Sequence, residues 1–197
     1  MIAARPSRAV AAWALFLGPA VLAWTPLRQA IDGRMVLQMT LLFPALLASG
    51  WAGAGLGGDR LPLARAFDRI DAGGLLGATL VICVSAFWML PAALDLGLLS
   101  DGVQLGKFAS WWIAGAALRR SWTRLANEPL AFFAGNLSWM LATAGLVYQE
   151  SDARLCVNYL IDDQWLAGRA LVLAAIALGA LALARLVRRE SASETLT

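Results

Sequence analysis

The sequence has no histidine, only two cysteines and few charged residues, and each shortage excludes a class of function. Without an imidazole, the chain cannot form a Ser-His-Asp triad, use histidine as a general base, or bind haem iron or copper through histidine. Two cysteines in 197 residues cannot make a disulfide scaffold, and no cysteine–histidine cluster is present to hold structural zinc. Charged residues are 15% of the chain and hydrophobic residues 60%, which is the reverse of a disordered protein.

What the sequence has instead is long apolar runs, which predict an all-α integral membrane protein. About 20 apolar residues in a helix cross the roughly 30 Å core of a bilayer, and charged residues divide this chain into six such runs. We expect one domain over residues 1–189, a bundle of about six transmembrane helices, and a disordered cytoplasmic tail over residues 190–197. The expected spans are about 9–24, 35–57, 74–98, 103–118, 129–148 and 165–187.

The first run could also be a cleavable signal peptide. However, Pro19, Trp24 and Pro26 stand where a small-residue cleavage site belongs, which favours a retained helix.

The basic residues predict how these helices are oriented, because lysine and arginine are retained on the cytoplasmic side of a membrane. With six spans, the side of both termini collects Arg5, Arg8, Arg60, Arg65, Arg69, Arg119, Arg120, Arg124, Arg185, Arg188 and Arg189. The other side collects only Arg28, Arg34, Lys107, Arg154 and Arg169. We therefore expect a multi-pass protein of the bacterial inner membrane, surrounded by lipid, with both termini in the cytoplasm. The net charge of +3 follows from this bias and does not point to nucleic acid as a partner.

Polar residues within the expected spans are few. Asp95, Lys107 and Arg169 lie near predicted helix ends, where long side chains can reach the membrane surface, so no buried charge is expected. Gln38 and Asn136 lie inside spans, and interhelical hydrogen bonds are their expected role.

Three prolines within the spans, Pro19, Pro44 and Pro91, predict local kinks. Kinked helices suggest a small transporter as one alternative function, although ordinary membrane-helix proline explains them as well. Gly73 and Gly77 have a four-residue spacing that predicts close helix packing.

Two segments on the outer face carry the remaining chemical signals. Asp162 and Asp163 precede the last span, where acidic side chains cap free backbone N–H groups. Met35 and Met39 are one helical turn apart, so both thioethers could approach a soft ion such as Cu(I), with Cys156 of a nearby loop as a third ligand. Against a metal site, methionine is common in membrane helices, and no histidine or second cysteine completes the set of ligands.

A family resemblance appears in three short segments. Residues 34–39 (Arg-Met-Val-Leu-Gln-Met), residues 127–131 (Asn-Glu-Pro-Leu-Ala) and residues 163–168 (Asp-Gln-Trp-Leu-Ala-Gly) resemble, in the same order, elements of the CtaG-like family. That family comprises multi-span assembly factors of cytochrome c oxidase. In and just after the first segment, Met35, Val36, Met39 and Pro44 fit the family pattern. The positions that we expect to serve as family-motif or interface residues are Arg34, Gln38, Pro44, Pro129, Asp163, Gln164 and Gly168.

The resemblance also implies that this chain has lost the family's copper-binding histidines. Family members carry histidines where this chain has Arg34 and Gln38, and neither an arginine nor a glutamine amide can replace imidazole as a copper ligand. We therefore expect a non-catalytic accessory subunit or assembly partner of a respiratory haem–copper oxidase, without a bound cofactor. Copper delivery through Met and Cys ligands is the alternative within this resemblance. An enzyme is not expected, because no nucleophile–base pair or acidic dyad is evident.

Overall fold

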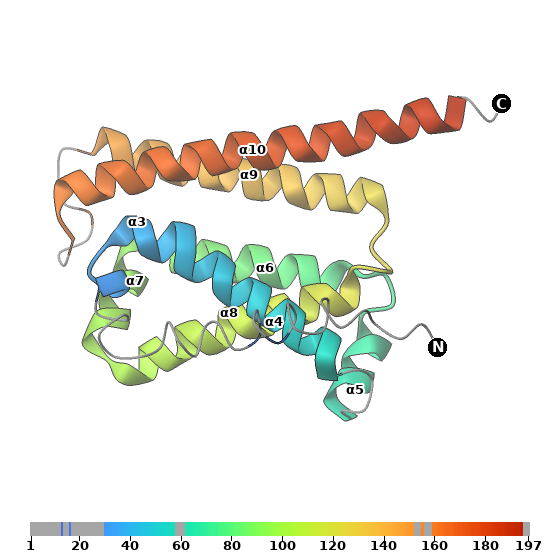
Figure 1. The fold of residues 1–197 in the computed structure, drawn as a ribbon, viewed down its shortest axis with the longest axis horizontal. Helices are drawn as coiled ribbons and strands as arrows, with labels where there is room; N and C mark the ends of the chain where they lie inside the picture. Colours follow the sequence, from blue (N-terminus) through green and yellow to red (C-terminus); the bar gives the residue numbers. More distant parts are fainter. Residues whose placement is uncertain are drawn as a thin grey trace.

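The structure is a computed structural model that describes residues 13, 16, 30–57, 62–151, 155 and 159–194, and its regular elements there are all helical (Figure 1). This confirms the expected all-α class. The elements are α3 (Met35–Leu37), the π-helical turn η1 (Gln38–Leu42), α4 (Phe43–Gly57), α5 (Pro62–Ile70), α6 (Leu75–Trp88), α7 (Pro91–Leu99), α8 (Asp101–Ser121), α9 (Asn127–Glu150) and α10 (Ile161–Glu194).

Three helical stretches among the described residues are long and apolar enough to cross a membrane: Met35–Leu56, Asn127–Glu150 and Ile161–Val187. A fourth is gained if Ala64–Ile70 and Leu75–Trp88, which meet at an angle of 102°, form one broken span. The three continuous stretches overlap the expected spans over 35–57, 129–148 and 165–187 and fit a helical membrane protein. The expected span over 9–24 lies outside the described residues, except for Trp13 and Phe16. α10 continues to Glu194 because no glycine or proline follows its expected end.

The expected continuous span over 74–98 is wrong, because the helix is broken at Met89 and Leu90. Pro91 begins α7, and the residue before it, Leu90, is extended with φ −72° and ψ 126°. A proline disfavours helical backbone in the residue that precedes it and cannot donate to a preceding turn. The predicted kink at this proline is therefore a complete break between α6 and α7.

The helix that contains Pro44 is distorted rather than broken. Directly before it, η1 widens the helix, and the N–H of Phe43 bonds to the carbonyl of Gln38, five residues back. Such a turn relaxes the crowding between a proline ring and the carbonyl of the previous turn. Pro19 lies outside the described residues.

α4, α6 and α8 pack through glycines that bring their backbones into contact. A Cβ atom on Gly50 would lie 1.9 Å from the carbonyl oxygen of Trp112, and one on Gly115 would lie 2.0 Å from that of Leu47. A Cβ atom on Gly77 would lie 2.7 Å from the carbonyl of Ala117, which confirms its predicted packing role. Only glycine permits this separation between the helices.

Ion pairs join α5 to the end of α8. Arg120 and Arg124 both donate to the carboxylate of Asp68, and the Arg124 contact is 2.9 Å long. The hydrogen bond from Arg120, with smaller contributions from Arg124 and from Coulomb attraction, lowers the pKa of Asp68 below its usual value, although partial burial opposes this. Asp71 accepts the N–H of Leu76 at 2.9 Å and so caps α6.

α9 and α10 form an antiparallel helical hairpin that lies beside the body formed by α3 to α8 (Figure 1). Within the hairpin, Gly145 and Gly168 face one another, and a Cβ atom on either would lie 2.6 Å from the carbonyl of the other. Ser138 donates to the carbonyl of Ala175 at 2.7 Å. Only 6% of the span in α9 and 11% of that in α10 is buried, against 50% of Met35–Leu56.

Candidate functional site

A buried ion pair lies where α8 begins. Lys107 has no exposed surface, and its Nζ lies 3.2 Å from Oδ1 of Asp32, a residue just before α3. The expectation that Lys107 reaches the membrane surface is wrong, because the segment that holds Asp32 folds inward to meet it. A charge removed from solvent in this way needs an opposite charge and hydrogen bonds to be tolerated.

Amide and hydroxyl groups extend the ion pair into a polar network. Nε2 of Gln104 donates to Oδ2 of Asp32 at 2.7 Å, and Nε2 of Gln38 donates to Oδ1 at 3.1 Å. The hydroxyl of Tyr159 then donates to Oε1 of Gln38 at 2.8 Å. The predicted interhelical hydrogen bonding of Gln38 is confirmed, and the network fastens α8, η1 and the loop before α10 together.

Sequence reasoning missed Asp32 and Gln104, although one signal was available. Gln104 and Lys107 are three residues apart, so they share the face of α8 that also carries buried Trp111 and Ala114. Two polar residues on an otherwise buried face indicate a buried polar partner. Oε1 of Gln104 is buried without a hydrogen-bond partner in the structure, which leaves one acceptor for a water molecule.

Two of the motif residues join the hairpin to its surroundings. Asp163 was expected to cap its own helix, but its carboxylate accepts the N–H of Met35 and so caps α3 on the other side of the interface. Gln164 is buried, donates to the carbonyl of Tyr148 at 3.2 Å and accepts the N–H of Leu155 at 2.9 Å. Gln164 therefore ties the end of α9 to the start of α10.

The other motif residues also have positions that the fold explains. Gly168 makes the close contact with Gly145, and Pro129 occupies the first turn of α9, where a missing N–H costs nothing. Pro44 is exposed after η1, and Arg34 is exposed as the residue before α3. The structure thus brings Gln38, Asp163 and Gln164 close to the interface of body and hairpin, while Arg34 and Pro44 face outward.

The candidate copper ligands lie in the core. Met35 is completely buried and Met39 is 5% exposed, and both belong to the apolar cluster that includes Leu42 and Tyr159. Cys156 lies outside the described residues. Across the part of the chain that the structure describes, no group of three or more histidine, cysteine, aspartate or glutamate side chains could hold a metal ion.

One polar residue of α9 faces away from the rest of the chain. Asn136 is exposed near the middle of the helix, opposite the face through which Leu141, Gly145 and Tyr148 pack inward. Its exposed neighbours on that face include Phe132, Gly135, Trp139 and Thr143. The expected interhelical hydrogen bond of Asn136 is thus not formed with any described helix of this chain.

We call this surface the Asn136 face. It is formed by Phe132, Gly135, Asn136, Trp139 and Thr143. No heavy atom lies within 4 Å of a Cβ atom built on Gly135, so this glycine opens a shallow gap beside the amide. A small residue next to a polar one is the pattern through which membrane helices meet closely and form hydrogen bonds.

Comparison with known proteins yields no relative: no protein-family model, curated protein or solved structure matches the chain.

Proposed function

We propose that this chain is a non-catalytic membrane protein that binds another membrane complex through the Asn136 face of α9. The expected partner is a respiratory haem–copper oxidase of the bacterial inner membrane, which rests on the resemblance to CtaG-like assembly factors. The observation that carries the proposal is an exposed amide in the middle of an apolar helix of membrane-spanning length.

Desolvation of the Asn136 amide favours a partner at this face. A polar amide in hydrocarbon lacks the hydrogen bonds that water would supply, and this costs free energy unless another group bonds to it. Amide side chains within membranes therefore favour contact with a second helix, and such hydrogen bonds contribute about 0.6 kcal/mol on average. Phe132 and Trp139, exposed by 65% and 75%, give the same face a large apolar area for packing. The occupant supported by these features is an apolar helix with a hydrogen-bonding side chain.

The motif residues support a scaffolding role rather than metal delivery. Asp163, Gln164 and Gly168 make contacts that position the hairpin, and Gln38 extends the buried network. These residues fix the position of the hairpin on the body, and a partner can recognise the surface that results. We propose that the chain has kept the scaffold of a copper-handling family and uses it for binding alone.

The proposed orientation has six spans with both termini in the cytoplasm. Support comes from the arginine-rich end of the bundle, which we define by Arg65, Arg69, Arg120, Arg124 and Arg185. Reporter fusions that fluoresce only in the cytoplasm test it. Fluorescence from a fusion after residue 197 and from an insertion at Thr123, but not from one at Glu150, is expected.

Cross-linking in the membrane tests the partner. A photo-activatable residue in place of Trp139 is expected to cross-link an oxidase subunit, whereas the same residue in place of Leu173, exposed on α10, is the control position. Mass spectrometry of the adducts identifies the partner. Adducts at position 139 that contain only lipid, or only a second copy of this chain, would contradict the proposal.

A matched pair of glycine variants tests the face itself. Gly135→Leu fills the gap beside Asn136 and is expected to lower the haem that co-purifies with the chain by about fivefold or more, since a misfitted helix contact costs about 1 kcal/mol. Gly106→Leu is the control, because Gly106 on α8 also has no heavy atom within 4 Å of a built Cβ atom. Equal loss of haem in both variants, or in neither, would argue against the Asn136 face.

A further inference from the structure

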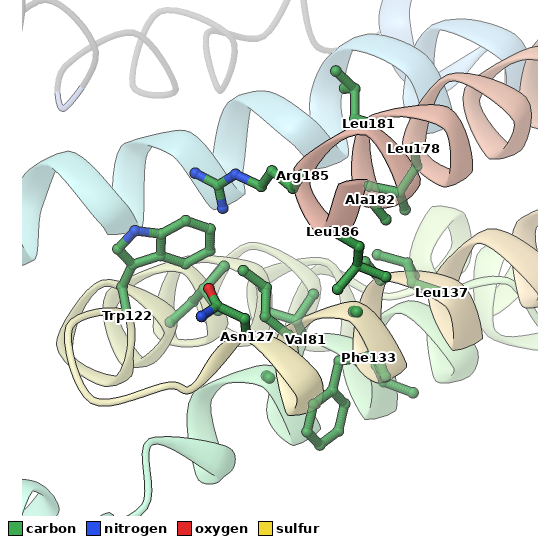
Figure 2. Close-up of a pocket in the computed structure, with 16 residues that line it drawn as sticks. Val81, Trp122, Asn127, Phe133, Leu137, Leu178, Leu181, Ala182, Arg185 and Leu186 are labelled. Atoms are coloured by element: carbon green, nitrogen blue, oxygen red, sulfur yellow. The ribbon is translucent and has the colours of Figure 1, made fainter. Parts of the chain in front are cut away.

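A groove of about 380 Å³ opens between the hairpin and the body at the arginine-rich end (Figure 2). Its walls come from α6, the end of α8, α9 and α10, and they are almost entirely apolar. Val81, Phe133, Leu137, Leu178 and Leu181 are among the side chains that line it. The volume lies within the range of about 300–1,000 Å³ that is typical of small-ligand sites.

Three polar or amphipathic side chains gather at one part of this groove: Arg185, Trp122 and Asn127 (Figure 2). The guanidinium of Arg185 lies over the ring of Trp122, 5.4 Å from its centroid. Among the described residues, Arg185 has no carboxylate within ion-pair distance. Arg120 and Arg124 of the same end, in contrast, are both paired with Asp68.

We propose that this groove binds one anionic phospholipid, with an acyl chain between the hairpin and the body and the phosphate at Arg185 and Asn127. The charge of Arg185 complements a phosphate, and the amide of Asn127 can donate a hydrogen bond to a phosphate oxygen. Basic pockets between membrane helices on the cytoplasmic side are suited to anionic head groups. Trp122 has the amphipathic character of residues at the level of lipid head groups.

The dimensions favour a lipid chain over a helix. An α-helix with its side chains is about 10–12 Å wide, which a groove of about 380 Å³ among four helices cannot admit without separating them. An extended acyl chain needs only the width of one methylene group. Apart from Arg185, Trp122 and Asn127, the residues that line the groove offer no polar side chain to a water-soluble ligand.

The head group must supply the selectivity. Lipid tails are as apolar as leucine side chains, so an acyl chain gains little by moving from the bilayer into the groove. The preference for an anionic over a zwitterionic lipid then depends on Arg185. This inference is independent of the proposed partner, because the groove and the Asn136 face involve different residues.

Native mass spectrometry tests the inference on the full chain. The protein is purified in a neutral detergent and equilibrated with equal amounts of phosphatidylglycerol and phosphatidylcholine, and the first bound lipid is identified. Wild type is expected to retain one phosphatidylglycerol in preference to phosphatidylcholine. Arg185→Gln is expected to reduce that preference about fivefold, the size that one arginine contributes at a lipid surface.

The chain offers a matched control. Arg119 lies over the ring of Trp51, 5.2 Å from its centroid, but it does not line the groove. Arg119→Gln removes the same charge from a similar arginine–tryptophan pair and is expected to leave the lipid preference unchanged. Equal effects of the two substitutions would overturn the inference, because they would show attraction to surface charge alone.

A second variant addresses the apolar part of the site. Ala182→Phe, in the wall of the groove, is expected to abolish retention of the first phosphatidylglycerol while Arg185 remains. Unchanged thermal unfolding of this variant in detergent shows that the fold is intact. Retention of the lipid by Ala182→Phe, or no preference for phosphatidylglycerol in wild type, would overturn the inference.

Discussion

The body and the hairpin of this protein use their apolar helices in opposite ways. The body buries half of its longest span, and it is held by glycine contacts at Gly50 and Gly115 and by a buried charge pair. Few residues of the hairpin's two spans are fully buried, and the hairpin meets the body through one face, where Tyr148, Ala167 and Leu171 join the apolar core and Asp163 caps α3. The difference shows that the body's longest span is packed mainly against other helices of this chain, whereas the spans of the hairpin present more of their residues outward.

The largest expected effect comes from breaking the charge pair of the body. Lys107→Met removes the ammonium group that lies 3.2 Å from the buried carboxylate of Asp32 and is expected to lower the free energy of unfolding by about 3–5 kcal/mol. Thermal or denaturant unfolding in detergent, followed by tryptophan fluorescence, measures the change. Asp32→Asn combined with Lys107→Met is expected to recover part of the loss, because both charges of this pair are then removed. A Lys107→Met protein as stable as wild type would show that the pair does not hold the body.

A pair of alanine substitutions compares packing in the two regions directly. Gly115→Ala in the body places a Cβ atom 2.0 Å from the carbonyl of Leu47 and is expected to destabilise the fold by about 1–3 kcal/mol. Gly135→Ala in the hairpin meets no neighbour and is expected to stabilise α9 by about 0.5–1 kcal/mol, the helix preference of alanine over glycine. Effects of equal sign in the same unfolding assay would remove the distinction between the regions.

The polar contact that joins the regions has a smaller expected effect. Asp163→Ala removes the cap that the hairpin provides to α3 and is expected to cost about 1 kcal/mol. Asp162→Ala is the matched control, since Asp162 is exposed in the same first turn of α10. Hydrogen exchange at the start of α3 should rise in the first variant only. Equal hydrogen exchange at the start of α3 in both variants would show that Asp163 does not cap this helix.

The smallest effect concerns the ion pairs at the arginine-rich end. Because the pKa of Asp68 is lower in the folded protein than its ordinary value of 3.8, its contribution to stability is fully present above that value. The contribution is lost as the pH falls through the lowered pKa, since the carboxylate is then protonated in the folded state as well. Asp68→Asn should therefore show a weaker loss of stability than wild type as the pH is lowered from about 6 to about 3. Parallel pH profiles would contradict this assignment.

Hydrophobic runs predicted the class of the fold and the position of its longest helices, because length and apolar content are local properties. They failed at Pro91, where the break depends on one residue, and at Lys107, whose burial depends on Asp32 from another segment. Asp163 shows the same limit. Its place at the start of the last span predicted a cap on its own helix, but it lies in the first turn of α10 and caps α3, because the hairpin packs on α3.

The candidate site residues also divide into those that the sequence could identify and those that it could not. The three motif segments singled out Gln38, Asp163, Gln164 and Gly168, and the structure gives each a definite contact. The groove around Arg185 could not be predicted, because its lining residues come from four helices that are distant in the sequence. A cavity of this kind is a property of how the helices meet, and no single helix carries its pattern.

The contact between Gly145 and Gly168 has a consequence for biosynthesis. α9 and α10 satisfy their own backbone hydrogen bonds, and this pair of glycines, with Ser138 and Gln164, supplies the contacts that hold the two helices to one another. Helices in a bilayer can form first and associate afterwards. The hairpin can therefore form before it packs on the body, and its arrival supplies the cap on α3 and the two walls of the groove that belong to α9 and α10. Assembly of the last two helices would thus complete both sites at once.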